Sequence, residues 1–220
     1  MMRRIRKLLR LEKKANILGE EDMPDAIILA AGMLGKQTLF PKALLEYGGK
    51  TAIEHQLNWL KPFVNKIIIA CHSKECSEIF KHLGLGKKMN IEFSTESELL
   101  GTAGATKKSL LKSKAGHFIV CNVDDLTDID LNALIDFGTN TMCIANPRLN
   151  YGVMEIEGFD VKRYREKPIL RDIWANCGIY YLDRKTIEKF PDKGSLEHDI
   201  FPYTNMKAFK HFGMWKTFGK

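Results

Sequence analysis

Two glycines and two lysines follow an apolar segment near the start of the chain. The stretch DAIILAAGMLGKQTLFPKALL, residues 25–45, leads from apolar residues into Gly32 and Gly35, with Lys36 and Lys42 just beyond. Glycine lets backbone N–H groups approach an anion closely, and lysine adds positive charge. The combination favours a phosphate-binding loop, although a plain strand-to-helix turn accounts for the glycines at least as well. The spacing is neither that of a Walker A loop nor that of a dinucleotide fingerprint.

Two later segments carry groups that also suit phosphate chemistry. LLGTAGATKKSL places Gly101, Thr102 and Gly104 at a predicted helix start, where free N–H groups can contact a base or a phosphate. FIVCNVDDLTDIDL ends an apolar run on Asp124. A carboxylate there suits Mg²⁺, which proteins bind through one or two carboxylates together with substrate phosphates. Asp125 is the less favoured ligand, because successive side chains of an extended segment point to opposite sides.

These groups need a scaffold that brings strand ends together. Short apolar runs alternate with segments of helical spacing, which predicts parallel strands covered by helices on both faces. In such sheets the ligand lies at the carboxyl ends of the strands. The predicted strands are 26–30, 66–72, 90–96 and 117–123, and the predicted helices are 51–63, 73–84 and 101–114. We also expect Asp128 to cap a helix that follows it.

Charge and length bound the organisation of the chain. The 220 residues carry a net charge of +7, and residues 1–14 hold seven Lys/Arg against one Glu, so the remainder is near neutral. This disfavours a general nucleic-acid binder. We expect a basic N-terminal segment and linker over 1–24 and one domain over 25–220. The basic segment is best interpreted as a solvated terminus, and a helix on an anionic membrane surface or on a protein partner is the alternative.

The cysteines and the hydropathy of the chain indicate the cellular compartment of the protein. The five cysteines show no C-x-x-C spacing, so we expect reduced thiols rather than disulfides or a zinc site. No run reaches the length of a membrane span, and no apolar signal segment follows the basic start. These features predict a cytoplasmic protein.

Nine short motifs lie along the chain from about residue 25 to the C-terminus. In order, they are AIILAAG, FPKALL, GKTAIEHQL, LGTAGA, NVDDLTDIDL, YGVMEI, EKP, NCGIYYL and LEHDIFP. Together they resemble the sugar-1-phosphate nucleotidyltransferases, and most closely the glucose-1-phosphate and mannose-1-phosphate branches. The resemblance implies a Rossmann-like, mixed but mostly parallel sheet and a Mg²⁺-dependent enzyme. An oxygen of the sugar 1-phosphate attacks the α-phosphorus of an NTP, giving an NDP-sugar and pyrophosphate. The resemblance to this family also implies a homo-oligomer.

The same resemblance assigns roles to individual residues. The nucleotide would lie against Ala31, Gly32, Gly35, Gly101 and Thr102, with Lys36 and Lys42 on the phosphates and Asp124 on Mg²⁺. The sugar 1-phosphate would meet Gly152, Glu166, Lys167 and Asn176. Without the flanking motifs, Glu166 and Lys167 would be interpreted as an exposed hairpin ion pair.

Two departures from the family pattern support an alternative. The first loop lacks the usual arginine, and Lys36 cannot reproduce the bidentate fork of that side chain. Thr217 stands where members often have a second metal-binding Asp. The alternative is a non-catalytic homologue that binds nucleotide or sugar nucleotide as a regulatory or partner-docking module.

Overall fold

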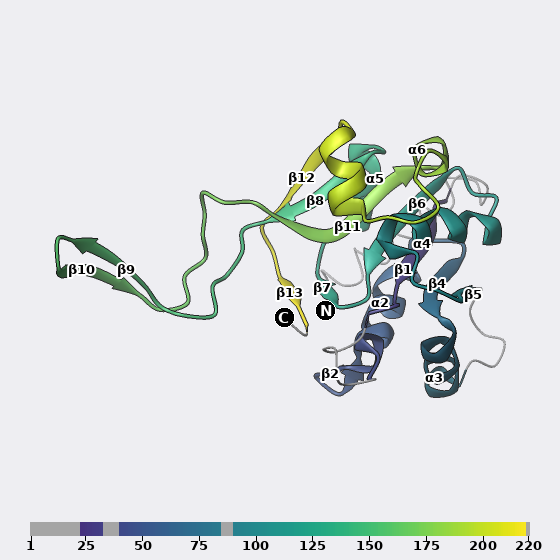
Figure 1. The fold of residues 1–220 in the computed structure, drawn as a ribbon, viewed down its shortest axis with the longest axis horizontal. Coiled ribbons are helices and arrows are strands. Elements are labelled where there is room, and N and C mark those ends of the chain that lie inside the picture. Colours follow the sequence, from purple (N-terminus) through teal and green to yellow (C-terminus); the bar gives the residue numbers. More distant parts are fainter. Residues whose placement is uncertain (1–22, 33–39, 85–89, 219–220) are drawn as a thin grey trace, which may run out of the picture.

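A seven-stranded sheet forms the centre of the protein. The structure, a computed structural model, describes residues 23–32, 40–84 and 90–218. The strand order is β12-β8-β11-β6-β1-β4-β5 (Figure 1). The strands are β1 (Asp25–Leu29), β4 (Ile67–His72), β5 (Ile91–Glu96), β6 (His117–Asn122), β8 (Thr141–Ala145), β11 (Ala175–Asp183) and β12 (Lys207–His211). Only β11 runs against its neighbours β6 and β8, while the other neighbouring pairs are parallel. The mixed, mostly parallel sheet is therefore confirmed.

Helices cover both faces of this sheet, as predicted. One face is covered by α2 (Ala52–Leu60), α3 (Ser73–Leu83) and α5 (Leu131–Phe137), and the other by α4 (Gly101–Ser109), α6 (Arg184–Glu188) and the short helical turn η4 (Leu196–Ile200). Alternate residues of β1 pack on the two faces of the sheet, with Ala26 and Ile28 in one hydrophobic cluster and Ile27 and Leu29 in the other. Strands buried on both faces explain the continuous apolar runs in the sequence.

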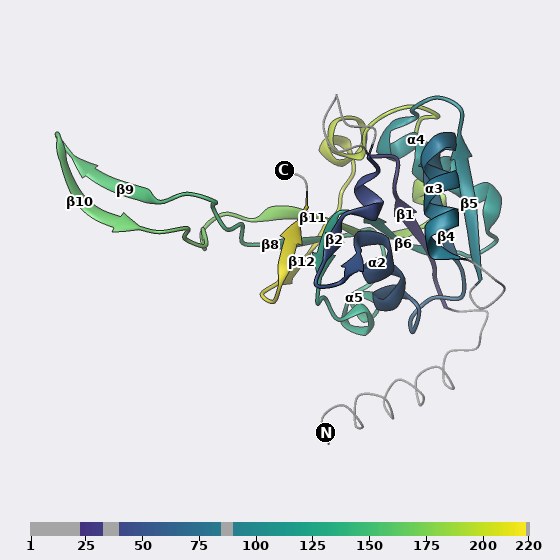
Figure 2. The same cartoon turned by 90° about the horizontal axis from the view of Figure 1, so that it is seen from below.

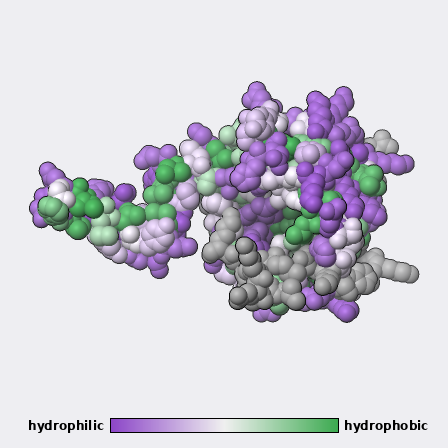
Figure 3. Space-filling model, viewed as in Figure 1, coloured by the Kyte–Doolittle hydropathy of each residue, from purple (hydrophilic) through white to green (hydrophobic). Residues whose placement is uncertain are grey.

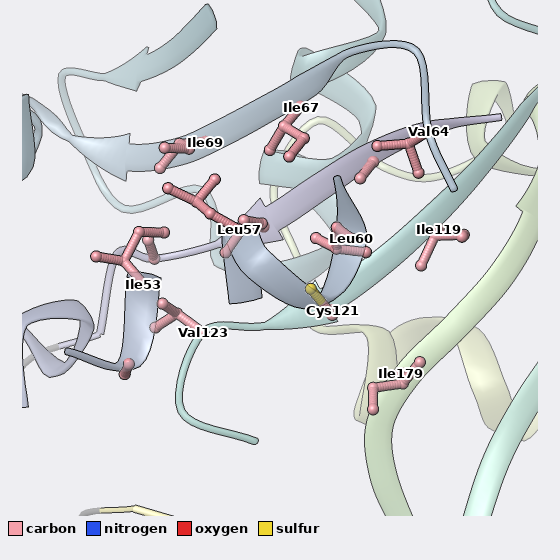
Figure 4. Close-up of a cluster of buried hydrophobic side chains, with 14 of the residues drawn as sticks. Ile53, Leu57, Leu60, Val64, Ile67, Ile69, Ile119, Cys121, Val123 and Ile179 are labelled. Carbon is pink, nitrogen blue, oxygen red and sulfur yellow. The ribbon is translucent and has the colours of Figure 1, made fainter. Parts of the chain in front are cut away.

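The helical spacing in the sequence produces the core. Figure 4 shows Ile53, Leu57 and Leu60 of α2 directed toward Ile69 of β4 and Cys121 of β6. Burying a side chain of this size stabilises the fold by roughly 1.5–3 kcal/mol. The helix begins with a capping box, in which Thr51 and Glu54 satisfy each other's backbone N–H groups. These contacts fix α2 beside the carboxyl ends of β1 and β6.

Short elements complete the fold at its edges. They are η2 (Lys42–Leu44), β2 (Glu46–Tyr47), β3 (Lys50–Thr51), η3 (Leu110–Lys112), β7 (Asp125–Thr127), η5 (Phe201–Tyr203) and β13 (Trp215–Thr217). Strand β13 pairs antiparallel with β7, so the C-terminal segment lies beside the turn that follows β6. No helix of the described residues is long and apolar enough to cross a membrane.

A long hairpin stands out from the body. Residues 146–174, which we call the hairpin arm, leave the end of β8, form β9 (Val153–Glu157) and β10 (Asp160–Arg165), and return to β11. Figures 1 and 2 show the arm projecting from the sheet, away from the helices. The direction of this hairpin could not be predicted from the sequence.

Two expectations are wrong. Cys71 and Cys76 form a disulfide, with their Cα atoms 5.6 Å apart, whereas Cys121, Cys143 and Cys177 are free and buried. Cys71 lies near the end of β4 and Cys76 in the first turns of α3, and the sharp strand-to-helix passage brings them together without C-x-x-C spacing. Asp130, not Asp128, caps α5 by accepting a hydrogen bond from Asn132 N. The predicted basic segment, residues 1–14, lies outside the described residues.

Candidate active site

A cavity opens at the carboxyl ends of the central strands. Its volume is about 290 Å³. It is lined by Leu29, Ala31, Gly32, Lys42, Ala70, Glu96, Leu99, Gly101, Thr102, Ala105, Asn122, Val123 and Asp124. Six predicted site residues are among them: Ala31, Gly32, Lys42, Gly101, Thr102 and Asp124. Gly35 and Lys36 belong to residues 33–39, outside the described part of the chain. The cavity occupies the place expected for a ligand in an open α/β sheet.

A larger hollow lies elsewhere and lacks these groups. It measures about 480 Å³, lies between α4 and α6, and is lined by Lys107, Lys108 and Arg184 among others. Of the residues singled out in the sequence, and within the part of the chain that the structure describes, Gly104 of α4 lines it, but the Lys42–Asp124 pair does not. Because it is away from the strand ends, we place the chemistry in the smaller cavity, which we call the central pocket.

Lys42 and Gly32 bring the two ends of the first loop together. Lys42 N donates a hydrogen bond to Gly32 O at 3.0 Å. A Cβ on Gly32 would lie 3.2 Å from Lys42 Cδ, so the glycine leaves room for the lysine stem. The Lys42 ammonium then reaches across to Asp124 Oδ2 at 2.8 Å. A cation and a carboxylate thus meet at the floor of the central pocket.

The two neighbouring aspartates have different environments. Asp125 is buried and accepts hydrogen bonds from Asn122 Nδ2, Trp215 Nε1 and Thr217 Oγ1. Burial raises its pKa, and this outweighs the hydrogen bonds from Thr217 and Asn122 that lower it. Asp124 instead lines the pocket and faces Lys42. Asp124 is therefore the carboxylate available to a ligand, and Asp125 anchors the turn beneath it.

Two distant parts of the chain, α2 and the C-terminal segment, hold this turn. Gln56 of α2 donates to Asp125 O at 2.7 Å. Phe218 N donates to Asp124 O at 2.8 Å, next to the pairing of β13 with β7. Thr217, which stands where a second acid was expected, thus contacts Asp125 and stabilises the turn through its hydroxyl.

Asn176 contributes to a bulge in β11. Its Oδ1 accepts from Gly178 N, and its Nδ2 donates to Tyr180 Oη at 2.8 Å. Gly178 has a φ of 68°, and a Cβ there would collide with Asn122 and Asp125. Asn176 does not line the central pocket, and its amide braces the strand that packs behind the Asp125 turn.

Helix α4 begins at the pocket wall. Gly101 has a φ of 72°, and a Cβ on it would come within 2.9 Å of the carbonyl carbon of Gly194. The Leu100 cap provides no side-chain hydrogen bond to the first turn. The Thr102 hydroxyl accepts from Leu196 N at 2.8 Å, so it fixes the 195–200 segment. A ligand here would meet the backbone of the first turn.

Glu96 is a pocket residue that the sequence argument missed. It lies at the end of β5, is 1% exposed, and lines the pocket. Its Oε2 accepts from Leu100 N at 3.0 Å, but Oε1 has no hydrogen-bond partner within the described part of the chain. A buried acceptor left open is costly unless something binds it. The only sequence signal was its position at the carboxyl end of a predicted strand.

A metal ion would depend on a ligand at this site. Among the described residues, no group of three or more His, Cys, Asp or Glu could hold a metal ion. Two carboxylates line the pocket: Asp124 faces Lys42, whereas Glu96 accepts a hydrogen bond from Leu100 N at its other end. Mg²⁺ commonly binds to one or two carboxylates plus substrate phosphates, and Asp124 fits that arrangement.

The remaining predicted residues lie on the hairpin arm. Gly152, Glu166 and Lys167 do not line the central pocket. Glu166 accepts a hydrogen bond from Tyr164 Oη, which raises the Tyr164 pKa. A Cβ on Gly152 would come within 2.6 Å of the Tyr164 ring. These residues therefore form one local unit, separate from the pocket of the same chain.

Comparisons with known proteins agree with this geometry. Residues 26–202 match the family described as nucleotidyl transferase. The mannose-1-phosphate guanylyltransferase catalytic subunit beta of Drosophila melanogaster is 29% identical over 201 residues, covering 82% of this chain and 54% of the fly protein. The chain thus spans about half the length of that relative.

Two bacterial proteins match along most of their length. The D-glycero-alpha-D-manno-heptose 1-phosphate guanylyltransferase of Campylobacter jejuni is 31% identical, with 84% of this chain and 87% of the relative covered. The crystal structure of HddC from Yersinia pseudotuberculosis complexed with GMP-PN has a TM-score of 0.66 and 27% identity, covering 90% of this chain and 95% of that chain. The predicted resemblance to sugar-1-phosphate nucleotidyltransferases is confirmed, and the chain belongs to the nucleotidyl transferase family.

Proposed function

We propose that the protein transfers a nucleoside monophosphate, preferentially GMP, from its triphosphate to a manno-configured sugar 1-phosphate. The observation that carries this proposal is the central pocket, where the Lys42–Asp124 pair and the open Glu96 oxygen face one cavity. Relatives named for mannose 1-phosphate and for a manno-heptose 1-phosphate support the sugar class.

Glu96 supports guanine as the base. A carboxylate only accepts hydrogen bonds, and guanine presents two adjacent donors, N1–H and the N2 amino group. Adenine and cytosine each offer one amino donor beside an acceptor, and uracil offers one N–H. A buried site built to accept hydrogen bonds rejects ligands that leave it unpaired. The open Oε1 atom could accept from either of the two guanine donors, and neither donor has an acceptor beside it on the other donor's side, so we expect a preference for GTP.

Lys42 and Asp124 would divide the work on the phosphates. When a triphosphate enters, the Lys42 ammonium can leave Asp124 and neutralise phosphate oxygens. Asp124 then becomes free to hold Mg²⁺, which would supply charge neutralisation on the phosphates when bound. The swap keeps each charge paired, so it avoids an isolated carboxylate in a half-buried site.

The reaction would be a direct displacement. An oxygen of the sugar 1-phosphate forms a bond to the α-phosphorus, the bond from that phosphorus to the β-phosphate oxygen breaks, and pyrophosphate leaves. Transfers of this kind depend on positioning and charge neutralisation and require no covalent enzyme intermediate. On the sugar side, Lys167 would pair with the sugar phosphate, Glu166 would accept from hydroxyls, and Gly152 and Asn176 would shape the site. Because nucleoside triphosphates are cytoplasmic substrates, this function is consistent with the predicted cytoplasmic location.

Pyrophosphate release tests the proposal. The purified chain with Mg²⁺ is assayed with each of four NTPs against mannose 1-phosphate, manno-heptose 1-phosphate and glucose 1-phosphate. We expect release with GTP and a manno-configured acceptor. Tight GTP binding with no release from any pair would instead support the non-catalytic alternative, which Thr217 and the missing arginine favour.

A further inference from the structure

The hairpin arm carries an uncovered apolar face. Met154 lies opposite Tyr164 and Ile156 opposite Val161, and the irregularity between Val161 and Arg163 keeps these four side chains on one side. Each is more than half exposed, and Phe159 at the tip is fully exposed. Figure 3 shows hydrophobic residues along the arm where it stands clear of the body. An isolated two-stranded hairpin is only marginally stable in water. We therefore expect the apolar face of the arm to be buried against another protein surface.

The arm is ordered by contacts within itself. On the other face, Glu155 pairs with Arg165 at 3.5 Å and Glu157 with Lys162 at 3.4 Å. Nearer the body, Leu149 N donates to Pro168 O at 3.1 Å. Within the residues that the structure describes, the hydrogen bonds and ion pairs of 151–168 join the arm to itself. The arm is thus held together by its own contacts, and the described remainder of the same chain does not pack against its apolar face.

The direction of the arm is braced at its base. Asn146 Nδ2 donates to the carbonyl oxygens of Arg171 at 3.1 Å and Ile173 at 2.8 Å, tying the two limbs together. The Trp174 ring packs edge-on against Phe212 at 5.6 Å, and the Lys210 ammonium lies 5.0 Å above it. These contacts fix the direction in which the base of the arm leaves the body.

The arm also holds groups that the proposed function requires at the pocket. Glu166 is positioned by Tyr164, and Lys167 has a φ of 43°, a strained conformation for a residue that precedes proline. Strained backbone conformations of this kind are found most often at functional sites. Both side chains are more than half exposed. The central pocket of the same chain lacks them.

Resting on the proposed function, we propose that two copies of the chain exchange their arms, so that Glu166 and Lys167 of each copy complete the central pocket of the other. The arm leaves the end of β8 and rejoins the start of β11, the same sheet edge at which the pocket opens. A two-fold axis beside this edge would lay each arm across the partner's pocket, in a self-complementary contact. Leu99, 61% exposed at the pocket, and the apolar face of the arm would then be covered together.

Complementation between two inactive variants tests the exchange. Lys167→Ala damages the arm and Asp124→Ala damages the pocket. Co-expressed with different tags and purified through both, a mixed dimer contains one site with both defects and one with none. We expect it to recover about half of the wild-type activity per dimer. Activity that stays at the level of the single variants would show that each arm serves its own chain, and would overturn the proposal.

A second measurement needs no activity, so that failure of the exchange and failure of the proposed function can be told apart. Isotopically light and heavy chains are expressed separately, mixed, and unfolded and refolded together so that mixed dimers form, and the dimers are then treated with an amine-reactive crosslinker. Links from Lys162 or Lys167 to body lysines should join a light and a heavy peptide. Links confined to chains of one isotope, or a monomer in sedimentation, would overturn the proposal even if the enzyme is active.

Matched arm variants locate the contact. Ile156→Asp places a charge on the apolar face and should weaken self-association at least tenfold in sedimentation. Arg163→Ala, on the opposite face with an ion pair of 4.0 Å to Glu155, should leave association unchanged. Equal effects of the two variants would contradict docking through the apolar face.

Discussion

The Nζ atom of Lys42 lies 2.8 Å from Oδ2 of Asp124, although 82 positions separate the two residues in the chain. One follows the first strand of the sheet and the other follows β6, and β1 pairs directly with β6. The register of two parallel strands therefore creates the charged floor of the central pocket. The chemistry that we propose begins with the opening of this pair.

Replacing Lys42 should reduce turnover without unfolding the protein. Lys42→Ala removes a cation directed at developing phosphate charge, and we expect kcat/KM to fall roughly 100-fold or more. Lys66→Ala is the matched control, since Lys66 also forms a 2.8 Å ion pair, with Glu92, but does not line the pocket. Steady-state rates and thermal melts of both variants check this. Equal losses of activity would contradict a phosphate role for Lys42.

Changing Glu96 should alter the choice of base. Glu96→Gln can keep the hydrogen bond from Leu100 N but turns an amino donor toward the pocket, so GTP affinity should drop about 10- to 100-fold. The affinities of the other three NTPs should change less. Glu98→Gln is the control, because Glu98 is exposed and pairs with Lys193. Calorimetric binding of the four NTPs distinguishes the outcomes, and an unchanged GTP preference would remove Glu96 from base recognition.

The pH dependence of stability should carry the signature of Asp125. Burial raises its pKa above the ordinary value of 3.8, so the folded state holds the proton more tightly than the unfolded chain. Its contribution to the free energy of unfolding is therefore present below pH 3.8 and is lost as pH rises through the folded-state pKa. Asp125→Asn stays neutral and escapes this loss. In urea titrations, the stability of the variant relative to wild type should rise with pH, whereas a difference independent of pH would contradict the assignment.

Tyr164 should act through Glu166 on the sugar side of the reaction. Tyr164→Phe removes the hydroxyl that donates to Glu166, and a misplaced acceptor should raise KM for the sugar 1-phosphate about 3- to 10-fold. GTP affinity should not change, because Glu166 is proposed to accept from sugar hydroxyls and not from the nucleotide. Tyr203→Phe, at an exposed position outside the hairpin arm, is the control. A loss of GTP affinity instead would place Tyr164 in the nucleotide site.

The sequence predicts the features that arise from local pattern. Apolar runs with helical segments between them indicate the central strands, and strand ends in such a sheet indicate that Lys42 and Asp124 share an edge. Glu96 could not be identified as a site residue, because a glutamate at a strand end has no local signal that separates a pocket acceptor from an exposed residue. Its partner, Leu100 N, depends on how the following loop turns.

Tertiary geometry decides the features that were missed. The Cys71–Cys76 disulfide depends on the angle between β4 and α3, which spacing alone does not reveal. Asp130 caps α5 because the Asp128 side chain is engaged with His211 and with Met214 N, residues more than 80 positions away. The direction of the hairpin arm depends on packing at Trp174, where the sequence shows only an isolated aromatic residue.

Transfer of the α-phosphate tests the central claim most directly. GTP labelled at the α-phosphorus is incubated with the purified chain, Mg²⁺ and a manno-configured sugar 1-phosphate, with the Asp124→Asn variant as control. We predict that the label moves into a GDP-sugar with an equal amount of pyrophosphate, and that the variant forms little product. Label that remains in GTP, or that appears as GMP or GDP without a sugar, would contradict the assignment of this pocket as a nucleotidyltransferase site.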